Sequence, residues 1–140
     1  MRYISTRGQT EPLDFERALL TGLARDGGLY VPEDWPAVDA ATLRAWRGLA
    51  YPDLARRVMA PFVAETFDDE ELGAIVDRAY AAFDHAAIVP LTQTHANEWL
   101  VALYHGPTLA FKDVAMQILA RCYDRVLARR DERVTLIGAT

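Results

Sequence analysis

The stretch from Leu43 to Phe83 repeats apolar residues at the spacing of α-helices, and this repeat constrains the fold more than any other feature of the sequence. Tyr51-Pro52 can open one helix that runs to about Thr66, because proline suits the first turn of a helix. The acidic residues 68–70 suit the start of a second helix, since negative charge is favourable at a helix N-terminus. Two helices joined by so short a connection are expected to pack antiparallel.

Shorter elements precede this helical stretch. Residues 2–6 are rich in strand formers, and apolar residues at helical spacing predict an amphipathic helix over residues 13–25. Asp26-Gly27-Gly28 can end that helix, because glycine readily takes the left-handed conformation of a C-terminal cap. The same glycines could suggest a phosphate-binding loop, but no strand–loop–helix order surrounds them, so we expect a turn. Residues 29–32 then read as a short extended piece.

After residue 88 the pattern changes from the spacing of helices to that of strands. Residues 89–94 and 98–104 predict a hairpin joined near Ala96-Asn97. A long helix is predicted over residues 111–130. The apolar run that follows, residues 134–137, is typical of a buried parallel strand.

This order of elements predicts an α/β chain in two parts. Residues 1–85 are expected to form a mostly helical N-terminal domain, and residues 86–140 to begin a second domain in which Trp99 and Tyr104 lie in the core. A strand followed only by Gly138-Ala139-Thr140 predicts a fragment, because such strands normally lead into a glycine-rich loop and a helix. The alternative is a terminal strand that completes a small sheet.

Composition excludes several function classes. Apolar residues make up 51% of the 140 residues and charged residues 25%, which is ordinary for a globular chain. A net charge of −5 and a pI of about 5.1 give no electrostatic reason to bind nucleic acid or an anionic membrane. The single cysteine, Cys122, can form no internal disulfide and reads as a small buried hydrophobe. With no apolar signal region and no run of transmembrane length, a reducing cytoplasm is the expected location.

Lys112 is the residue whose position points to chemistry. A Gly-Pro turn and an apolar stretch lead to it at the start of the predicted helix 111–130. Positive charge is unfavourable at a helix N-terminus, so this position, with partial burial, favours the neutral amine that a Schiff-base lysine needs. On the residues alone, a surface lysine that extends from the helix start explains the position better.

Four runs of the sequence resemble one family, the threonine synthases. Tyr104–Asp113 is similar to the segment of these enzymes that attaches pyridoxal 5′-phosphate (PLP). Tyr3–Gly8 and Ala18–Pro32 resemble the opening of the same family, in the same order. Ile137–Thr140 is similar to the start of the loop that binds the PLP phosphate.

The resemblance implies a fold-type II PLP enzyme, so that residues 86–140 would begin the PLP-dependent catalytic domain. Such an enzyme converts O-phospho-L-homoserine and water to L-threonine and phosphate, and Lys112 corresponds to the lysine that holds the cofactor as an aldimine. The freed amine then moves protons as acid and base. Because the rest of the phosphate loop and most of the substrate site are absent, the 140-residue chain by itself is expected to have little or no activity.

Three neighbours of Lys112 admit two readings each. His105 could touch cofactor or substrate, but a structural role bonded to backbone is favoured. Thr108 could offer its hydroxyl to substrate, but a cap for a helix that begins near Leu109-Ala110 is favoured. Asp113 could orient Lys112 or merely suit the helix N-terminus.

Two alternatives to a threonine synthase stay open on the sequence. Another fold-type II PLP enzyme, such as a serine/threonine dehydratase, would use the same lysine chemistry on a different substrate. A non-catalytic helical module, in which residues 40–85 bind a partner and Lys112 is incidental, belongs to a different class. The oligomeric state is open, because an exposed sheet edge in a fragment would itself invite association.

Overall fold

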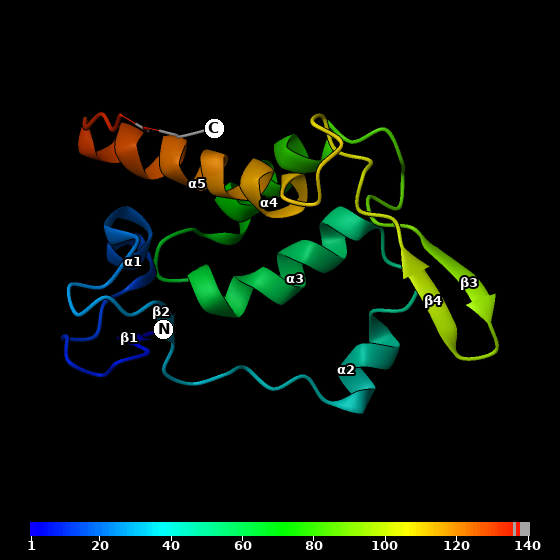
Figure 1. The fold of residues 1–140 in the computed structure, drawn as a ribbon, viewed down its shortest axis with the longest axis horizontal. Helices are drawn as coiled ribbons and strands as arrows, with labels where there is room; N and C mark the ends of the chain where they lie inside the picture. The colour runs from blue at the N-terminus through cyan, green and yellow to red at the C-terminus, as the bar shows by residue number, and fades with distance from the viewer. Residues whose placement is uncertain (136, 138–140) are drawn as a thin grey trace.

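A computed structural model describes residues 1–135 and residue 137, and shows a mixed α/β chain, as predicted (Figure 1). Its elements in chain order are β1 (Tyr3–Ser5), α1 (Phe15–Thr21), β2 (Tyr30–Pro32), α2 (Ala40–Ala45), α3 (Tyr51–Val63), α4 (Asp69–Tyr80), β3 (Leu91–His95), β4 (Glu98–Val101) and α5 (Asp113–Arg130). Among the described residues, the strands form two separate antiparallel pairs, β1 with β2 and β3 with β4.

The turn predicted at Asp26-Gly27-Gly28 is confirmed, and it is bonded to the first strand. The Asp26 carboxylate accepts hydrogen bonds from the Ser5 hydroxyl (2.8 Å) and from the backbone N–H groups of Gln9 (3.0 Å) and Gly28 (2.9 Å). Desolvation acts to raise the pKa of Asp26, but the hydrogen bonds from Gly28, Ser5 and Gln9 outweigh it and lower that pKa. A Cβ at Gly28 would lie 2.2 Å from the Ser5 hydroxyl oxygen, so only glycine fits there.

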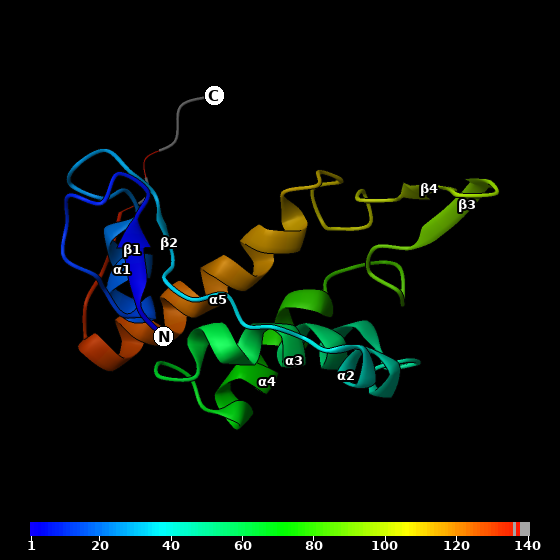
Figure 2. The same ribbon diagram turned by 90° about the horizontal axis from the view of Figure 1, so that it is seen from below.

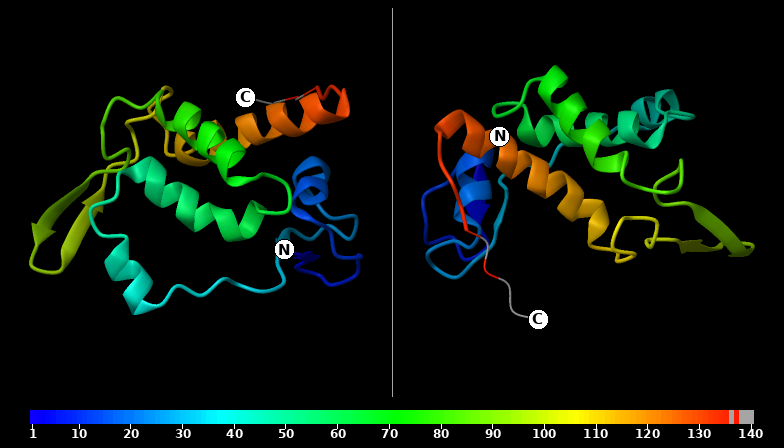
Figure 3. Two further views of the ribbon diagram at one scale, coloured as in Figure 1. Left: turned by 180° about the vertical axis from the view of Figure 1, so that it is seen from behind. Right: turned by 90° about the horizontal axis from the view of Figure 1, so that it is seen from above.

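Helix α4 is held at its start and buried along one side. Asp68 and Glu71 form a reciprocal capping box, which satisfies two backbone N–H groups at the helix N-terminus. Figure 3 shows α4 running back along α3, as the short connection predicts. The side of α4 that faces the core buries six residues: Leu72, Gly73, Ile75, Val76, Ala79 and Tyr80.

Helix α5 closes this core from the other side. Ile118, Cys122 and Val126 are its buried apolar residues, at helical spacing, and they join the cluster built by α4. The Tyr123 hydroxyl donates a hydrogen bond to the backbone carbonyl of Leu19 at 2.6 Å and so ties α5 to α1. Figure 2 shows α5 passing from the N-terminal elements toward the hairpin. The domain boundary expected near residue 85 stays a prediction.

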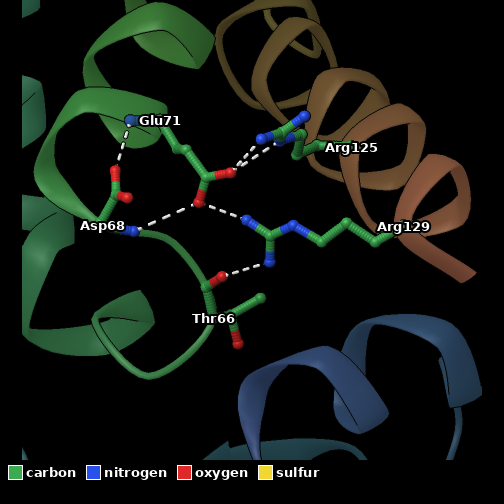
Figure 4. Close-up of polar contacts among 5 residues, drawn as sticks. All are labelled: Thr66, Asp68, Glu71, Arg125 and Arg129. Atoms are coloured by element: carbon green, nitrogen blue, oxygen red, sulfur yellow. Dashed lines mark hydrogen bonds and ion pairs between the residues drawn. The ribbon is translucent and has the colours of Figure 1, made fainter.

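Two ion pairs fix the outer face of the contact between α4 and α5 (Figure 4). The Glu71 carboxylate is paired with the guanidinium groups of Arg125 and Arg129, and Arg129 also donates to the Thr66 carbonyl at 2.6 Å. Hydrogen bonds from Arg129 and then Arg125 lower the pKa of Glu71 to about 2. The charged form of this carboxylate is therefore part of the folded structure.

Several predicted details are wrong. Helix 13–25 is shorter, because Gly22 takes a φ of 69° at its C-terminal cap and Leu23 bridges to Leu29. The hairpin is confirmed, but Trp99 is 54% exposed, since the strands extend away from the helices (Figure 1). Tyr104 lies beyond β4, which ends at Val101 and not at residue 104, and it is 60% exposed.

The parallel strand expected at residues 134–137 is not formed by Val134, Thr135 or Ile137, and Leu136 lies outside the described residues. Both sheets among the described residues are two-stranded and antiparallel, and neither includes a strand from this run. The phosphate-loop residues Gly138-Ala139-Thr140 also lie outside the described residues.

In the part of the chain that the structure describes, no helix is both long enough and apolar enough to cross a bilayer. The described residues also hold no group of three or more His, Cys, Asp or Glu side chains placed to bind a metal ion.

Replacing Glu71 with glutamine should lower the melting temperature at pH 7 by about 3 °C, which corresponds to about 1 kcal/mol for partly exposed pairs. Because the pKa of Glu71 is lowered on folding, its contribution is complete above pH 4.5 and is lost as pH falls from 4.5 to about 2. Thermal unfolding followed by circular dichroism at pH 7, 5, 4 and 3 measures this. The gap between wild type and Glu71→Gln should narrow between pH 5 and pH 3, and it closes fully only near pH 2.

Glu70→Gln is the matched control, because Glu70 lies on the same turn and joins none of the ion pairs formed by the described residues. An equal loss of stability in both variants would show that the Arg125 and Arg129 pairs contribute nothing specific.

The Cys122 thiol should be unreactive in the folded chain. Burial raises the pKa of Cys122 to about 11, so little of the thiol is ionised at pH 8. Only 2% of the residue is exposed, so reagents in solvent cannot reach the sulfur. A disulfide reagent that releases a coloured product on reaction with a thiol should react slowly with the native chain at pH 8. It should react at once with the chain unfolded in urea. Rapid native reaction would contradict the packing of α5 on the core.

Candidate functional site

The segment that carries Lys112 connects the hairpin to α5 (Figures 1 and 2). Lys112 is the only lysine in the chain, which has fifteen lysine and arginine residues in all, so every other basic residue apart from the histidines is arginine. The count of lysines in the sequence contains this signal, but the spacing of its motifs does not reveal it. Among the side chains of the sequence, only Lys112 therefore offers a primary amine.

Lys112 differs from its prediction in two respects. It is the N-terminal cap of α5, and not a residue inside the helix, because α5 begins at Asp113. Its side chain is exposed, and not partly buried as expected, since no described residue packs over it. Lys112 also takes part in none of the ion pairs formed by the described residues. The amine is thus open to a small molecule arriving from solvent.

The helix starts late because residues 106–112 are folded as turns. Leu109 takes the left-handed conformation, with a φ of 60°, which a helix cannot contain. The Leu109 N–H donates to the Gly106 carbonyl at 3.1 Å, and the Asp113 N–H donates to the Ala110 carbonyl at 3.0 Å. Two successive turns therefore lead the chain into α5 at Lys112.

Asp113 is buried, with 3% of the residue exposed, and it binds back to the turn before it. One carboxylate oxygen accepts hydrogen bonds from the backbone N–H of Thr108 (2.8 Å) and from the Thr108 hydroxyl (2.9 Å). The prediction that Thr108 caps a helix beginning near Leu109-Ala110 is wrong, because its hydroxyl is bound to Asp113 and no helix begins there.

Gly106 lies against the same carboxylate. A Cβ on Gly106 would be 2.4 Å from the Asp113 Cβ and 2.5 Å from its Oδ2 oxygen. Real Cβ atoms do not approach so closely, so the backbone at this turn requires glycine. We name the set of Gly106, Thr108 and Asp113 the turn clamp.

His105 is bonded to Asp84, which lies between α4 and the hairpin. Its Nδ1 is 2.7 Å from an Asp84 carboxylate oxygen, and its carbonyl accepts the Asp84 N–H at 3.0 Å. The His85 ring lies against it, with centroids 4.8 Å apart. These contacts support a structural role for His105. The predicted bond of its ring to backbone is wrong, because the ring is bound to the Asp84 carboxylate, which the sequence pattern did not identify as its partner.

Polar grooves elsewhere on the surface do not include this segment. One of them lies between α4 and α5, and its lining includes Arg78, Arg121 and Asp124. It contains none of residues 103–113, so it does not extend the site around Lys112.

Comparison with known proteins gives one consistent family. A sequence profile described as "Threonine synthase N terminus" matches residues 2–80, more than half of the chain. The chain is 54% identical to a threonine synthase of Pseudomonas aeruginosa and 37% identical to the threonine synthase-like 2 protein of Homo sapiens. Both matches cover the whole chain but only 30% and 29% of those relatives.

Solved structures give the same picture. A crystal structure of PLP-bound threonine synthase from Brucella melitensis matches 95% of the chain and 29% of its own, with a TM-score of 0.92 and 52% identity. Threonine synthase from yeast matches 93% of the chain and 27% of its own, with a TM-score of 0.86 and 37% identity. The chain thus spans about 30% of the length of the relatives it matches. It belongs to the threonine synthase family, and it corresponds to the N-terminal part of that family's fold.

Proposed function

We propose that Lys112 binds PLP, and that the polypeptide carrying these 140 residues converts O-phospho-L-homoserine and water to L-threonine and phosphate. The observation that carries the proposal is the sole lysine of the chain, exposed at the start of α5 within the segment Tyr104–Asp113. The PLP-bound relative from Brucella melitensis, similar over 95% of this chain, supports it.

The residues present fit an aldehyde cofactor. An amine attacks an aldehyde only when it is accessible and can lose its proton. Lys112 is exposed and takes part in none of the ion pairs formed by the described residues, so its amine is accessible to an aldehyde. The arginine side chains of the sequence keep their protons and cannot form a bond to the aldehyde.

Lys112 has two tasks in this function. Its Nζ would condense with the aldehyde carbon of the cofactor, and the aldehyde oxygen would leave as water. Once the amine of the substrate has taken its place, the same Nζ would hold a proton and move it between substrate carbons. PLP, when bound, supplies the electron sink that makes those carbons acidic. The exposed side chain of Lys112 on a fixed helix start has the freedom that both tasks need.

Other parts of the function belong to the longer polypeptides of the family. Because the chain spans about 30% of its relatives, it carries only part of the site that the reaction requires. We propose that residues 1–85 form the N-terminal domain and that residues 86–140 begin the catalytic domain. We also propose that the protein is located in the cytoplasm. The buried thiol of Cys122, which forms no disulfide, agrees with a reducing compartment.

Incubating the chain with PLP and then with borohydride should fix a cofactor adduct on Lys112. Trypsin does not cleave at a modified lysine, so mass spectrometry should find the adduct on one peptide that contains residue 112. The Met1 amine, paired with the Glu65 carboxylate, is the other amine of the chain and serves as an internal reference. A folded chain with no adduct on residue 112 would refute the assignment of Lys112.

Lys112→Arg is the matched variant, because arginine keeps the charge and cannot condense with the aldehyde. It should keep the melting temperature of the wild type and lose only the adduct at residue 112.

In the polypeptide that carries these 140 residues, Lys112→Arg should reduce turnover of O-phospho-L-homoserine by at least about 10²–10⁴-fold, the usual contribution of an acid–base group. Phosphate release and threonine formation, measured together, test both products. Turnover of serine or threonine in preference to O-phospho-L-homoserine would instead identify a dehydratase.

A further inference from the structure

We propose that Asp113 is a positioning residue, which acts through the turn clamp to fix the backbone from which Lys112 extends. The inference rests on the proposed function of Lys112. It assigns to Asp113 one of the two roles that the sequence leaves open, and it adds Thr108 and Gly106 as the groups through which Asp113 acts.

The burial of the Asp113 carboxylate is the first observation. A buried carboxylate is unfavourable unless it is hydrogen-bonded, and here the described partners are the N–H and the hydroxyl of Thr108, at 2.8 and 2.9 Å. An acid that merely suited a helix N-terminus could stay in solvent, as Asp69 and Glu70 do at the start of α4. The bonds of Asp113 therefore serve the turn.

These bonds close the chain into a loop that contains Lys112. Thr108 and Asp113 are five residues apart, and they form the two ends of this loop. The hydrogen bonds from Thr108 to the Asp113 carboxylate hold the two ends together. Gly106 presses on the same carboxylate, at a distance that leaves no room for a Cβ. The backbone of Lys112 is thus held from the Asp113 side and from the Thr108 side.

Leu109 shows what the clamp holds in place. Its φ of 60° is a conformation that a branched apolar residue rarely takes, and its side chain is 69% exposed, so it gains little from packing. Such a conformation persists only where the surroundings impose it. The contact between Thr108 and Asp113 spans Leu109, and it constrains this residue together with the hydrogen bond from the Leu109 N–H to the Gly106 carbonyl.

A fixed backbone and a free side chain suit the two tasks of Lys112. Catalysis depends on holding a reacting group within a narrow range of positions, and supporting hydrogen bonds provide this. The amine must also travel between the cofactor aldehyde and the substrate carbons. Fixing the Lys112 backbone limits that travel to rotations of the side chain.

The test measures local order by ¹⁵N relaxation of backbone amides in the 140-residue chain. In the wild type, residues 109–112 should have order parameters near those of rigid backbone, about 0.85. Asp113→Ala removes both bonds and should lower these values below about 0.6. Thr108→Ser keeps the hydroxyl and the N–H and should keep the order of the wild type.

Tyr123→Phe is the control for general destabilisation. It lies on the same helix and removes one hydrogen bond, from its hydroxyl to Leu19, far from the turn clamp. It should lower the melting temperature and leave the order of residues 109–112 unchanged. If Asp113→Ala does not fold, Thr108→Val, which removes one bond of the two, replaces it in the same measurement.

Kinetics in the polypeptide that carries these residues provide the second measurement. Asp113→Ala should lower kcat at least tenfold while KM changes less than threefold, because the inference assigns Asp113 to the position of the amine that moves protons and not to contact with substrate. Thr108→Ser should retain most of kcat.

The outcomes separate this inference from the proposed function. Unchanged order of residues 109–112 in Asp113→Ala would overturn the positioning role, even if the PLP adduct forms on Lys112. Lowered order of residues 109–112 in Asp113→Ala, together with no PLP adduct on Lys112 of the wild type, would support the turn clamp and refute the proposed function. Lowered order with unchanged kcat would reduce Asp113 to a structural residue and also overturn the inference.

Discussion

The packing of α5 against α4 is the contact on which the rest of the structure depends. Ile118, Cys122 and Val126 complete a core that α4 begins, and the Glu71 carboxylate bound to Arg125 and Arg129 fixes its outer edge. The burial supplies most of the free energy, since apolar area counts for more than partly exposed ion pairs. The pairs fix which face of α5 turns toward α4. Lys112 begins this same helix, so the core sets the place of the amine.

The turn clamp adds a second level of control over the same residue. The core fixes the position of α5 as a rigid body, but it does not determine the direction in which the chain enters the helix. The bonds between Thr108 and Asp113, and the glycine at residue 106, settle that direction. A site built on a helix start thus combines the rigidity of the helix with a loop that can be shaped for chemistry.

Sequence patterns predicted the elements that depend on the spacing of apolar residues and on local turn and cap chemistry. Helices α3 and α4, the hairpin and the turn at Asp26 follow from apolar repeats and from the chemistry of acid, proline and glycine. Resemblance to threonine synthases selected Lys112, which its position alone did not.

What the patterns missed depends on tertiary contacts. The late start of α5 follows from the left-handed Leu109 and from a carboxylate that binds backwards along the chain, and no local propensity reports either. Trp99 and Tyr104 were expected in the core because aromatic residues usually lie there, but burial depends on which elements come to rest on a strand. The pairing of His105 with Asp84 joins residues 21 apart, and only the fold brings them together.

The hairpin illustrates how unequal the stability of one short chain can be. Every residue of β3 and β4 is exposed, so the two strands are held by backbone hydrogen bonds and by exposed side-chain contacts, those of Thr94 and His95 with Glu98, with no burial to reinforce them. Local opening of such a ribbon costs far less free energy than opening of the helices around Val126. Protection against hydrogen exchange should therefore fall steeply along the chain where α4 gives way to β3, and it should rise again at the turn clamp.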